Sequence, residues 1–195
     1  GLPRDFPALR TLEAMPNNLP QQLTTFVGRE HELAAVKEEL AGTRLLTLFG
    51  IGGVGKTRLS LQVAAEVVAS YPDGVWFVEL APIGDARLVP QALASVLGVR
   101  EEPGHSIQDA LLQHVRDRSQ LLVLDNCEHV IDACASLVHQ LLQASAGLSI
   151  LASSRERFNI AGETVFPVSP LSVPASGDAP SAGAAGACEA VRLFV

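Results

Sequence analysis

The residues from Gly50 to Thr57, with the sequence GIGGVGKT, constrain the fold more than any other part of the chain. They match completely the pattern of a glycine, four residues, a glycine, a lysine and a serine or threonine. An apolar stretch, 44–49, precedes them, and residues 56–70 follow with helical spacing of apolar side chains. Glycines let the backbone turn sharply and point its N–H groups inward, where the start of a helix adds positive charge. The pattern predicts a strand, a phosphate-binding loop and a helix, and its completeness disfavours a glycine-rich turn with a chance lysine.

Each part of this loop has an expected role towards a bound nucleotide. Lys56 is expected to reach the β- and γ-phosphates, and the Thr57 hydroxyl to bind Mg²⁺. Lys56 is also a candidate catalytic residue. The candidate nucleotide-binding residues of the loop and the first helical turn are Gly50, Gly52, Gly53, Val54, Gly55, Lys56, Thr57 and Arg58.

Apolar, strand-like segments alternate with helical ones along the chain. The expected strands are 44–49, 75–80, 120–125, 148–153 and 164–168, and the expected helices are 29–41, 56–70, 85–97, 106–117 and 130–143. The strands are continuously apolar, which is typical of a parallel sheet buried on both faces. We therefore predict an α/β fold with a five-stranded parallel sheet and helices on both faces. Ligands in such folds bind at the edge where the strands end.

Asp125 is the last residue of the segment 121–125, after four apolar residues. It is a candidate Mg²⁺ ligand and a candidate catalytic residue. If its strand neighbours the strand before the phosphate-binding loop, the carboxylate would lie beside the loop and hold the Mg²⁺ shell. The alternative is an aspartate that caps the next turn. The complete loop elsewhere in the chain favours the metal-binding interpretation.

The residue after Asp125 is Asn126, where many ATPases of this kind have an acid that activates the attacking water. An amide can orient water but cannot take its proton. Glu128 is the nearest acid and a candidate catalytic base. A solvated acid at the start of the next helix is an equally good interpretation of Glu128.

Arg155 follows the fourth expected strand in the sequence Ser153-Ser154-Arg155. The strand would deliver it to the ligand-binding edge, where it could contact the γ-phosphate as a sensor. The alternative is a surface arginine that pairs with Glu156 or Glu163. We expect Arg157 to lie on the surface.

The segment Phe26-Val27-Gly28-Arg29-Glu30 precedes the first expected helix. An apolar pair followed by glycine allows the backbone to approach a flat base closely. The alternative is a packing role, in which Phe26 and Val27 contact Leu33.

Composition narrows the function. With 14 Lys and Arg against 21 Asp and Glu, the formal net charge of −7 disfavours direct nucleic-acid binding, which needs clustered cations. Three sparse cysteines form no CxxC pair and favour a reducing compartment. No apolar run is long enough to span a bilayer. We expect a cytoplasmic protein, and we interpret the chain as a piece of a longer one.

The chain divides by composition into four expected segments. Residues 1–25, with prolines at 3, 7, 16 and 20, are expected to form an extended linker, and residues 26–171 the nucleotide-binding domain. Residues 172–186, rich in Ala, Ser, Gly and Pro, are expected to be a flexible linker. Residues 187–195 are expected to begin a helix that the chain does not complete.

Four motifs in this order and spacing resemble one family. They are FVGRE at 26–30, the phosphate-binding loop, VLDNCEH at 123–129 and SSRER at 153–157. Together they resemble the STAND class of signal-transduction ATPases, related to AAA+ and NB-ARC domains. Within it, the chain is similar to the ATPase modules of large bacterial transcriptional regulators of the antibiotic-regulatory and LuxR types. Residues 6–20 are similar to the linker that follows an adenylate/guanylate cyclase domain in some of these proteins.

The resemblance, which covers about residues 6–171, implies a switch that binds ATP or ADP with Mg²⁺. It implies base contacts by Val27, Gly28 and Arg29, a Mg²⁺ acid at Asp125 and a sensor at Arg155. It also implies covalently linked signalling or DNA-binding domains, a helical lid beyond residue 195, and a monomer for the chain by itself. The pair Asp125-Asn126 departs from the Asp-Asp or Asp-Glu pair of the wider class, which implies slow hydrolysis.

Three other functions are less consistent with the sequence. A GTPase would need an Asn-Lys-x-Asp motif after a late strand, and the chain has none. A metabolic kinase would need a basic lid, but residues 170–195 have few charges. A nucleotide-binding scaffold without significant hydrolysis stays the alternative, although intact Lys56, Thr57 and Asp125 disfavour a degenerate site.

Overall fold

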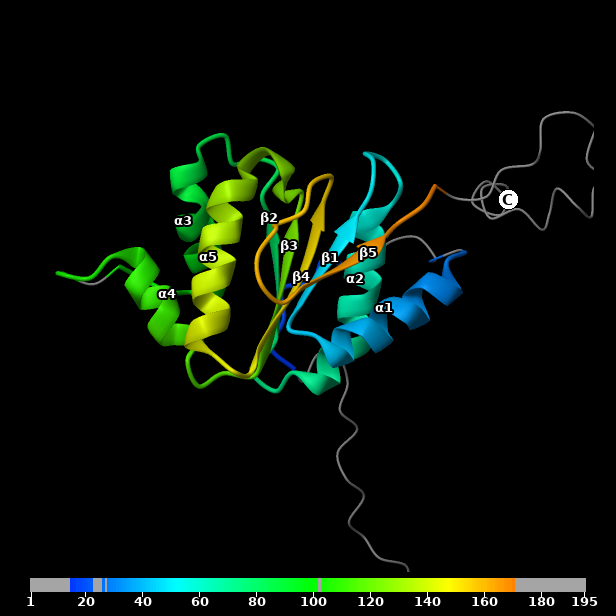
Figure 1. Ribbon diagram of the computed structural model, residues 1–195. Helices are drawn as coiled ribbons and strands as arrows, with labels where there is room; N and C mark the ends of the chain where they lie inside the picture. The colour runs from blue at the N-terminus through cyan, green and yellow to red at the C-terminus, as the bar shows by residue number, and fades with distance from the viewer. Residues whose placement is uncertain (1–14, 23–25, 27, 102, 171–195) are drawn as a thin grey trace, which may run out of the picture.

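The computed structural model describes residues 15–22, 26, 28–101 and 103–170 of the chain (Figure 1). Expectations for Val27, for the linker at 172–186 and for the helix at 187–195 concern residues outside this part. Within it, no helix is both long enough and apolar enough to cross a membrane.

The centre of the fold is one parallel sheet of five strands in the order β2-β3-β4-β1-β5. The strands are β1 (Leu45–Phe49), β2 (Val75–Glu79), β3 (Gln120–Asp125), β4 (Leu148–Ser154) and β5 (Glu163–Pro167). Every residue of β3 is buried, as expected for a strand covered on both faces. The predicted fold class, with five parallel strands, is confirmed.

Helices cover both faces of the sheet (Figure 1). They are α1 (Glu30–Gly42), α2 (Lys56–Val67), α3 (Val89–Leu97), α4 (Ile107–Val115) and α5 (Ile131–Ala144), with short 3₁₀ turns η2 (Val68–Ser70), η3 (Ala86–Leu88) and η4 (Cys127–Val130). In β3, Leu122 and Leu124 face α3, α4 and α5, whereas Leu121 and Val123 face α1 and α2. This alternation follows from the pleat of a strand, which sends successive side chains to opposite faces.

Each of the five expected helices differs from the observed one at an end, and three of these differences have a clear local form. The stretch predicted as one helix over 85–97 begins with η3, and the Asp85 side chain accepts a hydrogen bond from the Arg87 backbone N–H. The helix expected from residue 130 is preceded by η4. Gly42, expected to stop the first helix, is its last residue, and Thr43 returns to extended backbone.

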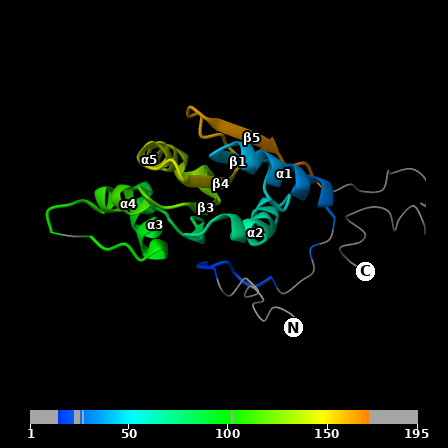
Figure 2. The same cartoon turned by 90° about the horizontal axis from the view of Figure 1, so that it is seen from below.

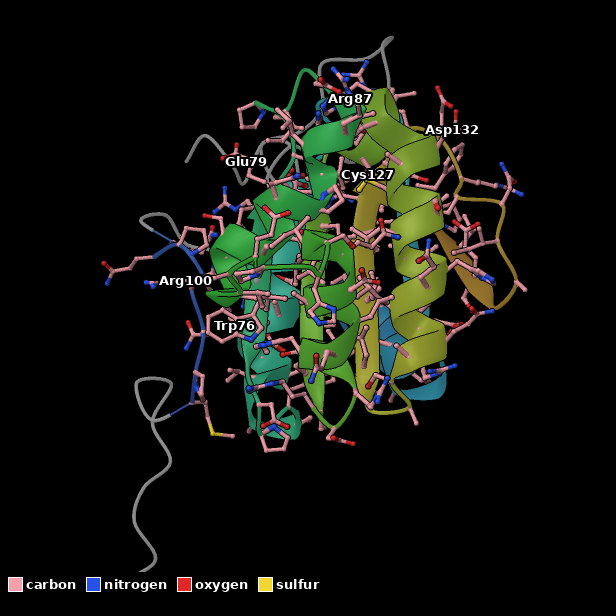
Figure 3. The ribbon with its side chains drawn as sticks, turned by 90° about the vertical axis from the view of Figure 1, so that its left-hand side faces the viewer. Trp76, Glu79, Arg87, Arg100, Cys127 and Asp132 are labelled. Carbon is pink, nitrogen blue, oxygen red and sulfur yellow. The ribbon has the colours of Figure 1, made fainter. Side chains whose placement is uncertain are left out.

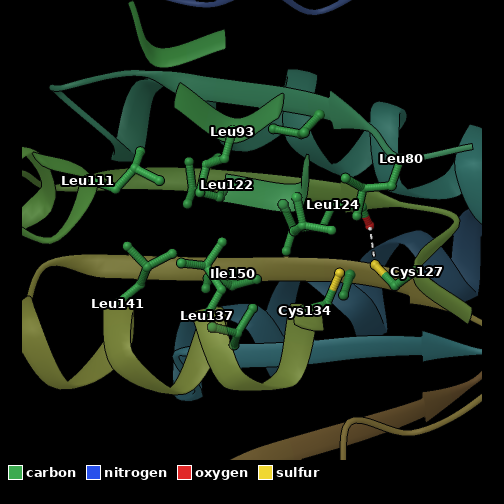
Figure 4. Close-up of a cluster of buried hydrophobic side chains, with 14 of the residues drawn as sticks. Leu80, Leu93, Leu111, Leu122, Leu124, Cys127, Cys134, Leu137, Leu141 and Ile150 are labelled. Atoms are coloured by element: carbon green, nitrogen blue, oxygen red, sulfur yellow. Dashed lines mark hydrogen bonds between the residues drawn. The ribbon is translucent and has the colours of Figure 1, made fainter. Parts of the chain in front are cut away.

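Two apolar clusters form the core, one on each face of the sheet. Figure 4 shows the cluster under α3, α4 and α5, where Leu93, Leu122 and Leu137 interdigitate. Trp76 packs at the margin of this cluster, on β2 (Figure 3). The second cluster joins α1 and α2 to the opposite face.

Residues 15–22, named here the edge segment, lie along β2. Asn17 forms an isolated parallel bridge with Val75. Figure 2 shows the edge segment, in dark blue, on the side of the molecule that α2 occupies. Part of the stretch expected to be an N-terminal linker therefore packs against the sheet.

Candidate nucleotide-binding site

The phosphate-binding loop joins β1 to α2 at the carboxyl edge of the sheet. Gly55 directly precedes α2 with a φ of 87°, in the left-handed region where glycine is strongly favoured. A side chain at Gly50 would place its Cβ 2.6 Å from the carbonyl oxygen of Val168. Glycine is therefore needed at both ends of the loop, once for conformation and once for close packing.

Lys56 lies folded against the loop that precedes it. Its Nζ donates to the carbonyl oxygens of Gly50, at 2.8 Å, and Ile51, at 3.0 Å. Burial is the largest cause that lowers the pKa of Lys56 below its ordinary value, and the charge of Arg155 adds to it. The charges of Glu128 and Asp125 act in the opposite direction. The loop thus holds a buried ammonium group at the place where phosphates are expected.

The Thr57 hydroxyl lies against Asp125, and both residues are predicted Mg²⁺ ligands. Thr57 Oγ1 is 2.8 Å from Asp125 Oδ1 and 3.0 Å from Oδ2. The two strands are not neighbours, which was the condition for this placement, because β4 lies between β1 and β3. Asp125 still reaches the loop, since β3 and the first turn of α2 meet at the same edge of the sheet.

Ser153, at the end of β4, is a site residue whose role the sequence reasoning missed. The β3–β4 register pairs Leu124 with Ala152, so that Asp125 and Ser153 fall side by side. The Ser153 hydroxyl donates to Asp125 Oδ1 and accepts from the Asn126 backbone N–H at 3.0 Å. β4 also contains Ser149 and Ser154, so nothing in the sequence singled out this hydroxyl.

Arg155 pairs with Glu128 across the end of the sheet. Arg155 Nε lies 2.9 Å from Glu128 Oε1. The second carboxylate oxygen, Glu128 Oε2, is buried, and among the described residues it has no hydrogen-bond partner. The alternative interpretation of Arg155, a surface arginine, expected it to pair with Glu156 or Glu163. Of these, Glu163 instead accepts from the backbone N–H groups at 158 and 159.

Arg157 is exposed and lies over the ring of Phe49, with its guanidinium carbon 5.5 Å from the ring centroid.

Asn126 adopts a left-handed φ of 63°. Its Nδ2 lies 3.4 Å from His129 Nδ1, and His129 Nε2 lies 3.0 Å from the carbonyl oxygens of both Leu80 and Ile83. His129 therefore connects the end of β3 to the chain that follows β2.

A cavity of about 460 Å³ lies at this edge of the sheet. Its lining residues are Gln22, Gly52, Gly53, Gly55, Lys56, Thr57, Arg58, Leu61, Asn126, Glu128, Ser153 and Arg155. Most of the residues predicted from the loop and strand ends are thus brought together. Gln22, from the edge segment, was not predicted.

Gly28 and Arg29, two of the three residues expected to contact the base, do not line this cavity. Gly28 has a φ of 74°, and Arg29 is buried and donates from Nη2 to the Ser169 carbonyl oxygen at 2.7 Å. Phe26 and Leu33 pack on the second apolar cluster, in line with the packing alternative for Phe26. Val54 also packs in that cluster, so only its backbone can face a ligand.

The donor set fits a magnesium ion held mainly by phosphate and water. A hydroxyl and a carboxylate are hard oxygen ligands, and Mg²⁺ in nucleotide sites keeps one or two protein ligands. Among the described residues, no group of three or more His, Cys, Asp or Glu side chains could hold a metal by itself. Thr57 and Asp125 therefore fit a metal that arrives with a nucleotide.

Comparisons with known proteins point to the same fold. An HTH-type transcriptional regulator of Mycobacterium tuberculosis, so named provisionally, is 47% identical over 134 residues, covering 69% of this chain and 15% of that protein. Regulatory protein AfsR of Streptomyces coelicolor is 33% identical over 165 residues, covering 75% of this chain and 16% of AfsR. The chain thus spans a small part of these relatives.

Two solved structures share the fold at low sequence identity. A STAND protein with a tetratricopeptide repeat sensor from Pyrococcus horikoshii matches with a TM-score of 0.51 and 17% identity, over 83% of this chain and 25% of that one. Cdc6p from Pyrobaculum aerophilum matches with a TM-score of 0.54 and 19% identity, over 78% of this chain and 47% of that one. The family model described as AAA domain matches residues 39–159, and the chain belongs to that family.

Proposed function

We propose that this chain binds ATP and ADP together with Mg²⁺, and that it acts as a nucleotide-dependent switch within a larger bacterial regulator. The contact between Thr57 Oγ1 and both oxygens of Asp125 carries this proposal. It brings two metal-binding groups from distant parts of the chain to the start of a helix that follows a glycine-rich loop. Helix starts of this kind bind phosphate, and the hydroxyl and carboxylate oxygens of Thr57 and Asp125 are of the kind that would hold Mg²⁺ there.

Each charged group has a role in this proposal. Lys56 exchanges the carbonyl oxygens of Gly50 and Ile51 for oxygens of the β- and γ-phosphates. The Ser153 hydroxyl keeps the Asp125 carboxylate directed towards Thr57. Thr57 and Asp125 would hold Mg²⁺, which would supply positive charge beside the phosphates. Gly28 and Arg29, together with Val27, which lies outside the described residues, would contact the base.

The regulatory part of the proposal rests on the relatives. The M. tuberculosis protein and AfsR are both named as regulators, and this chain corresponds to 15% and 16% of their lengths. A module that occupies so small a part of a regulator is suited to report nucleotide state to linked signalling or DNA-binding domains. We place this activity in the cytoplasm.

Hydrolysis should be slow. Asn126 has no basic group, and removal of one positioned base lowers a rate by about 10²–10⁴-fold. Glu128 is the proposed base, because its side chain lines the cavity and its Oε2, although buried, has no hydrogen-bond partner among the described residues. Its other oxygen is held by Arg155. The Asn126 amide and this ion pair also favour the second candidate function, a nucleotide-binding scaffold without significant hydrolysis.

Calorimetry with ATP, ADP and GTP, with and without Mg²⁺, tests the proposal. We expect Mg²⁺-dependent binding of adenine nucleotides and weaker binding of GTP. Lys56→Ala should reduce ATP affinity by about tenfold or more, the value of a charge-assisted bond. Lys37→Ala is the matched control, since Lys37 lies on α1 and pairs with Glu66. Equal affinity for ATP and GTP, or an unaffected Lys56→Ala variant, would contradict the proposal.

A turnover measurement separates the switch from the scaffold. We expect hydrolysis slower than the typical enzyme rate of about 10 s⁻¹. Glu128→Gln should abolish the residual activity and leave binding intact, whereas Glu156→Gln, which changes an exposed neighbour of Arg155, should leave both intact. Unchanged turnover in Glu128→Gln would remove Glu128 from the chemistry, and no turnover in the unsubstituted chain would favour the scaffold.

A further inference from the structure

The edge segment is attached to β2 by hydrogen bonds of strand type. The Val75 backbone N–H donates to the Pro16 carbonyl oxygen at 3.0 Å, and the Asn17–Val75 bridge is parallel. Gly74 allows this approach, because a Cβ at that position would lie 2.6 Å from the Pro16 oxygen. The segment therefore continues the sheet beyond its last full strand.

Asn18 strengthens this attachment with its side chain. Asn18 Nδ2 donates to the Phe77 carbonyl oxygen at 2.8 Å, and the Phe77 backbone N–H donates to Asn18 Oδ1 at 2.6 Å. The side-chain amide thus pairs with both backbone groups of one residue, as a residue of a neighbouring strand would. Met15 and Leu19 add apolar contacts by packing on the second apolar cluster, between the sheet and the helices α1 and α2.

At its end, the edge segment brings Gln22 to the nucleotide cavity. Gln22 lines the cavity together with Arg58 and Leu61, from the first turns of α2. Lys56 and Thr57, the proposed phosphate and Mg²⁺ ligands, line the same cavity. Gln22 therefore borders the cavity of the phosphate-binding loop, whereas the proposed base contacts, Gly28 and Arg29, do not line it.

We propose that the edge segment completes the nucleotide site, with Gln22 as a further nucleotide-binding residue and Asn18 as the residue that positions it. The Gln22 amide donates to a phosphate oxygen of Mg²⁺-ATP, and the Asn18–Phe77 pair fixes the chain that presents it. This inference rests on the proposed nucleotide binding. It assigns a role in the site to a segment outside the family match, which begins at residue 39.

The other explanation of the edge segment is protection of the sheet. An exposed edge strand can pair with another chain, and proteins cover such edges with short segments. Protection requires the contacts of Pro16, Asn17 and Asn18 but gives Gln22 no role. The two explanations therefore differ in the effect of changing Gln22 alone.

The test is calorimetric titration of Mg²⁺-ATP into four variants of the chain and the unsubstituted protein. Gln22→Ala should lower affinity about tenfold or more, because it removes a hydrogen bond to a charged phosphate oxygen. Gln21→Ala is the control, because it removes the same amide from the adjacent exposed position, which does not line the cavity. Asn18→Ala should lower affinity by a similar factor, since it releases Gln22.

The double variant Asn18→Ala/Gln22→Ala identifies the route. If Asn18 acts through Gln22, the two changes remove the same contact. The double variant should then have the same affinity for Mg²⁺-ATP as the single variant that binds more weakly. Thermal unfolding of Gln22→Ala should match that of the unsubstituted protein, which excludes a loss of folding as the cause. Full additivity would show that Asn18 does not act through Gln22 and would overturn its positioning role.

If the unsubstituted chain and the Gln22→Ala variant bind Mg²⁺-ATP equally well, this inference is overturned. The proposed function is unaffected by that result. Equal affinities would assign the edge segment to edge protection. An unsubstituted chain that binds no adenine nucleotide would overturn both.

Discussion

At the residue scale, the cations of the site are held by oxygen atoms of the chain itself. Lys56 donates to two loop carbonyls, and Arg155 pairs with Glu128. The Arg155 side chain is 60% exposed, whereas that of Glu128 is 15% exposed, so Arg155 is the partner that can turn towards a ligand. A charge-assisted bond to phosphate is worth about 1.5–3 kcal/mol. A γ-phosphate oxygen would therefore compete with Glu128 for Arg155.

This comparison predicts that Arg155 distinguishes ATP from ADP. Arg155→Ala should weaken ATP binding by about tenfold and ADP binding much less, because ADP offers no γ-phosphate oxygen. Arg157→Ala is the matched control, since Arg157 lies over Phe49 and does not line the cavity. Titration of each variant with both nucleotides gives the answer. Equal losses for ATP and ADP would show that Arg155 is no sensor.

The site residues that sequence could identify are those whose motif fixes their place. Lys56 and Thr57 follow from the loop pattern, and Asp125 from its position at the end of an apolar strand. Ser153 and Gln22 could not be found in this way. A serine in a buried strand and a glutamine in a proline-rich segment have many ordinary positions, and only the register of β3 with β4 and the pairing along β2 bring them to the cavity.

At the element scale, the sequence predicted which segments are strands but not their order. Buried parallel strands are all continuously apolar, so nothing local shows that β4 lies between β1 and β3. The boundaries of helices failed where short 3₁₀ turns intervene, as at η3 and η4. Such turns are set by the geometry of the connection to the preceding strand, which leaves little trace in apolar spacing.

The packing of η4 on α5 predicts the behaviour of two thiols. Cys127, in η4, is buried against Cys134, in α5, and its Sγ lies 3.6 Å from the Leu124 carbonyl oxygen (Figure 4). The contact with Cys134 and burial both raise the pKa of the Cys127 thiol well above its ordinary value. The folded state therefore favours the protonated, unreactive thiol. This contribution to the free energy of unfolding is fully present below the pKa that the Cys127 thiol has in the unfolded chain, and it is lost as the pH rises from there through the higher pKa of the folded state.

We expect Cys127 and Cys134 in the folded protein to resist alkylation between about pH 7 and pH 9, where an exposed thiol ionises and reacts. Both should react after unfolding in denaturant. The measurement is mass spectrometry after iodoacetamide treatment of a Cys188→Ser variant, because Cys188 lies outside the described residues. Rapid labelling of folded Cys127 at pH 8 would contradict the packing of η4 on α5.

At the scale of the whole molecule, the fold has a core on each face of the sheet and a site at one edge. The predicted architecture was confirmed because strands covered on both faces and a complete loop motif allow few arrangements. The relatives are several times longer than this chain, which corresponds to 15% of one and 16% of another. In the switch proposed here, the output therefore depends on segments outside this module.

The surface of the module predicts that it stays monomeric by itself. The large apolar side chains that are exposed in the described part of the chain are Ile51 and Leu88. A stable interface buries about 800 Å² on each partner, far more than two side chains supply. The net charge of −7 adds repulsion between copies. Light scattering should give the mass of one chain with and without Mg²⁺-ATP.

By resemblance to the STAND class, a chain extended through a helical lid should bind nucleotide more tightly, because a covered site excludes water and strengthens contacts to phosphate. Oligomers of the short chain on ATP addition, or equal affinities of the short and extended chains, would show that the nucleotide response resides in the α/β module alone.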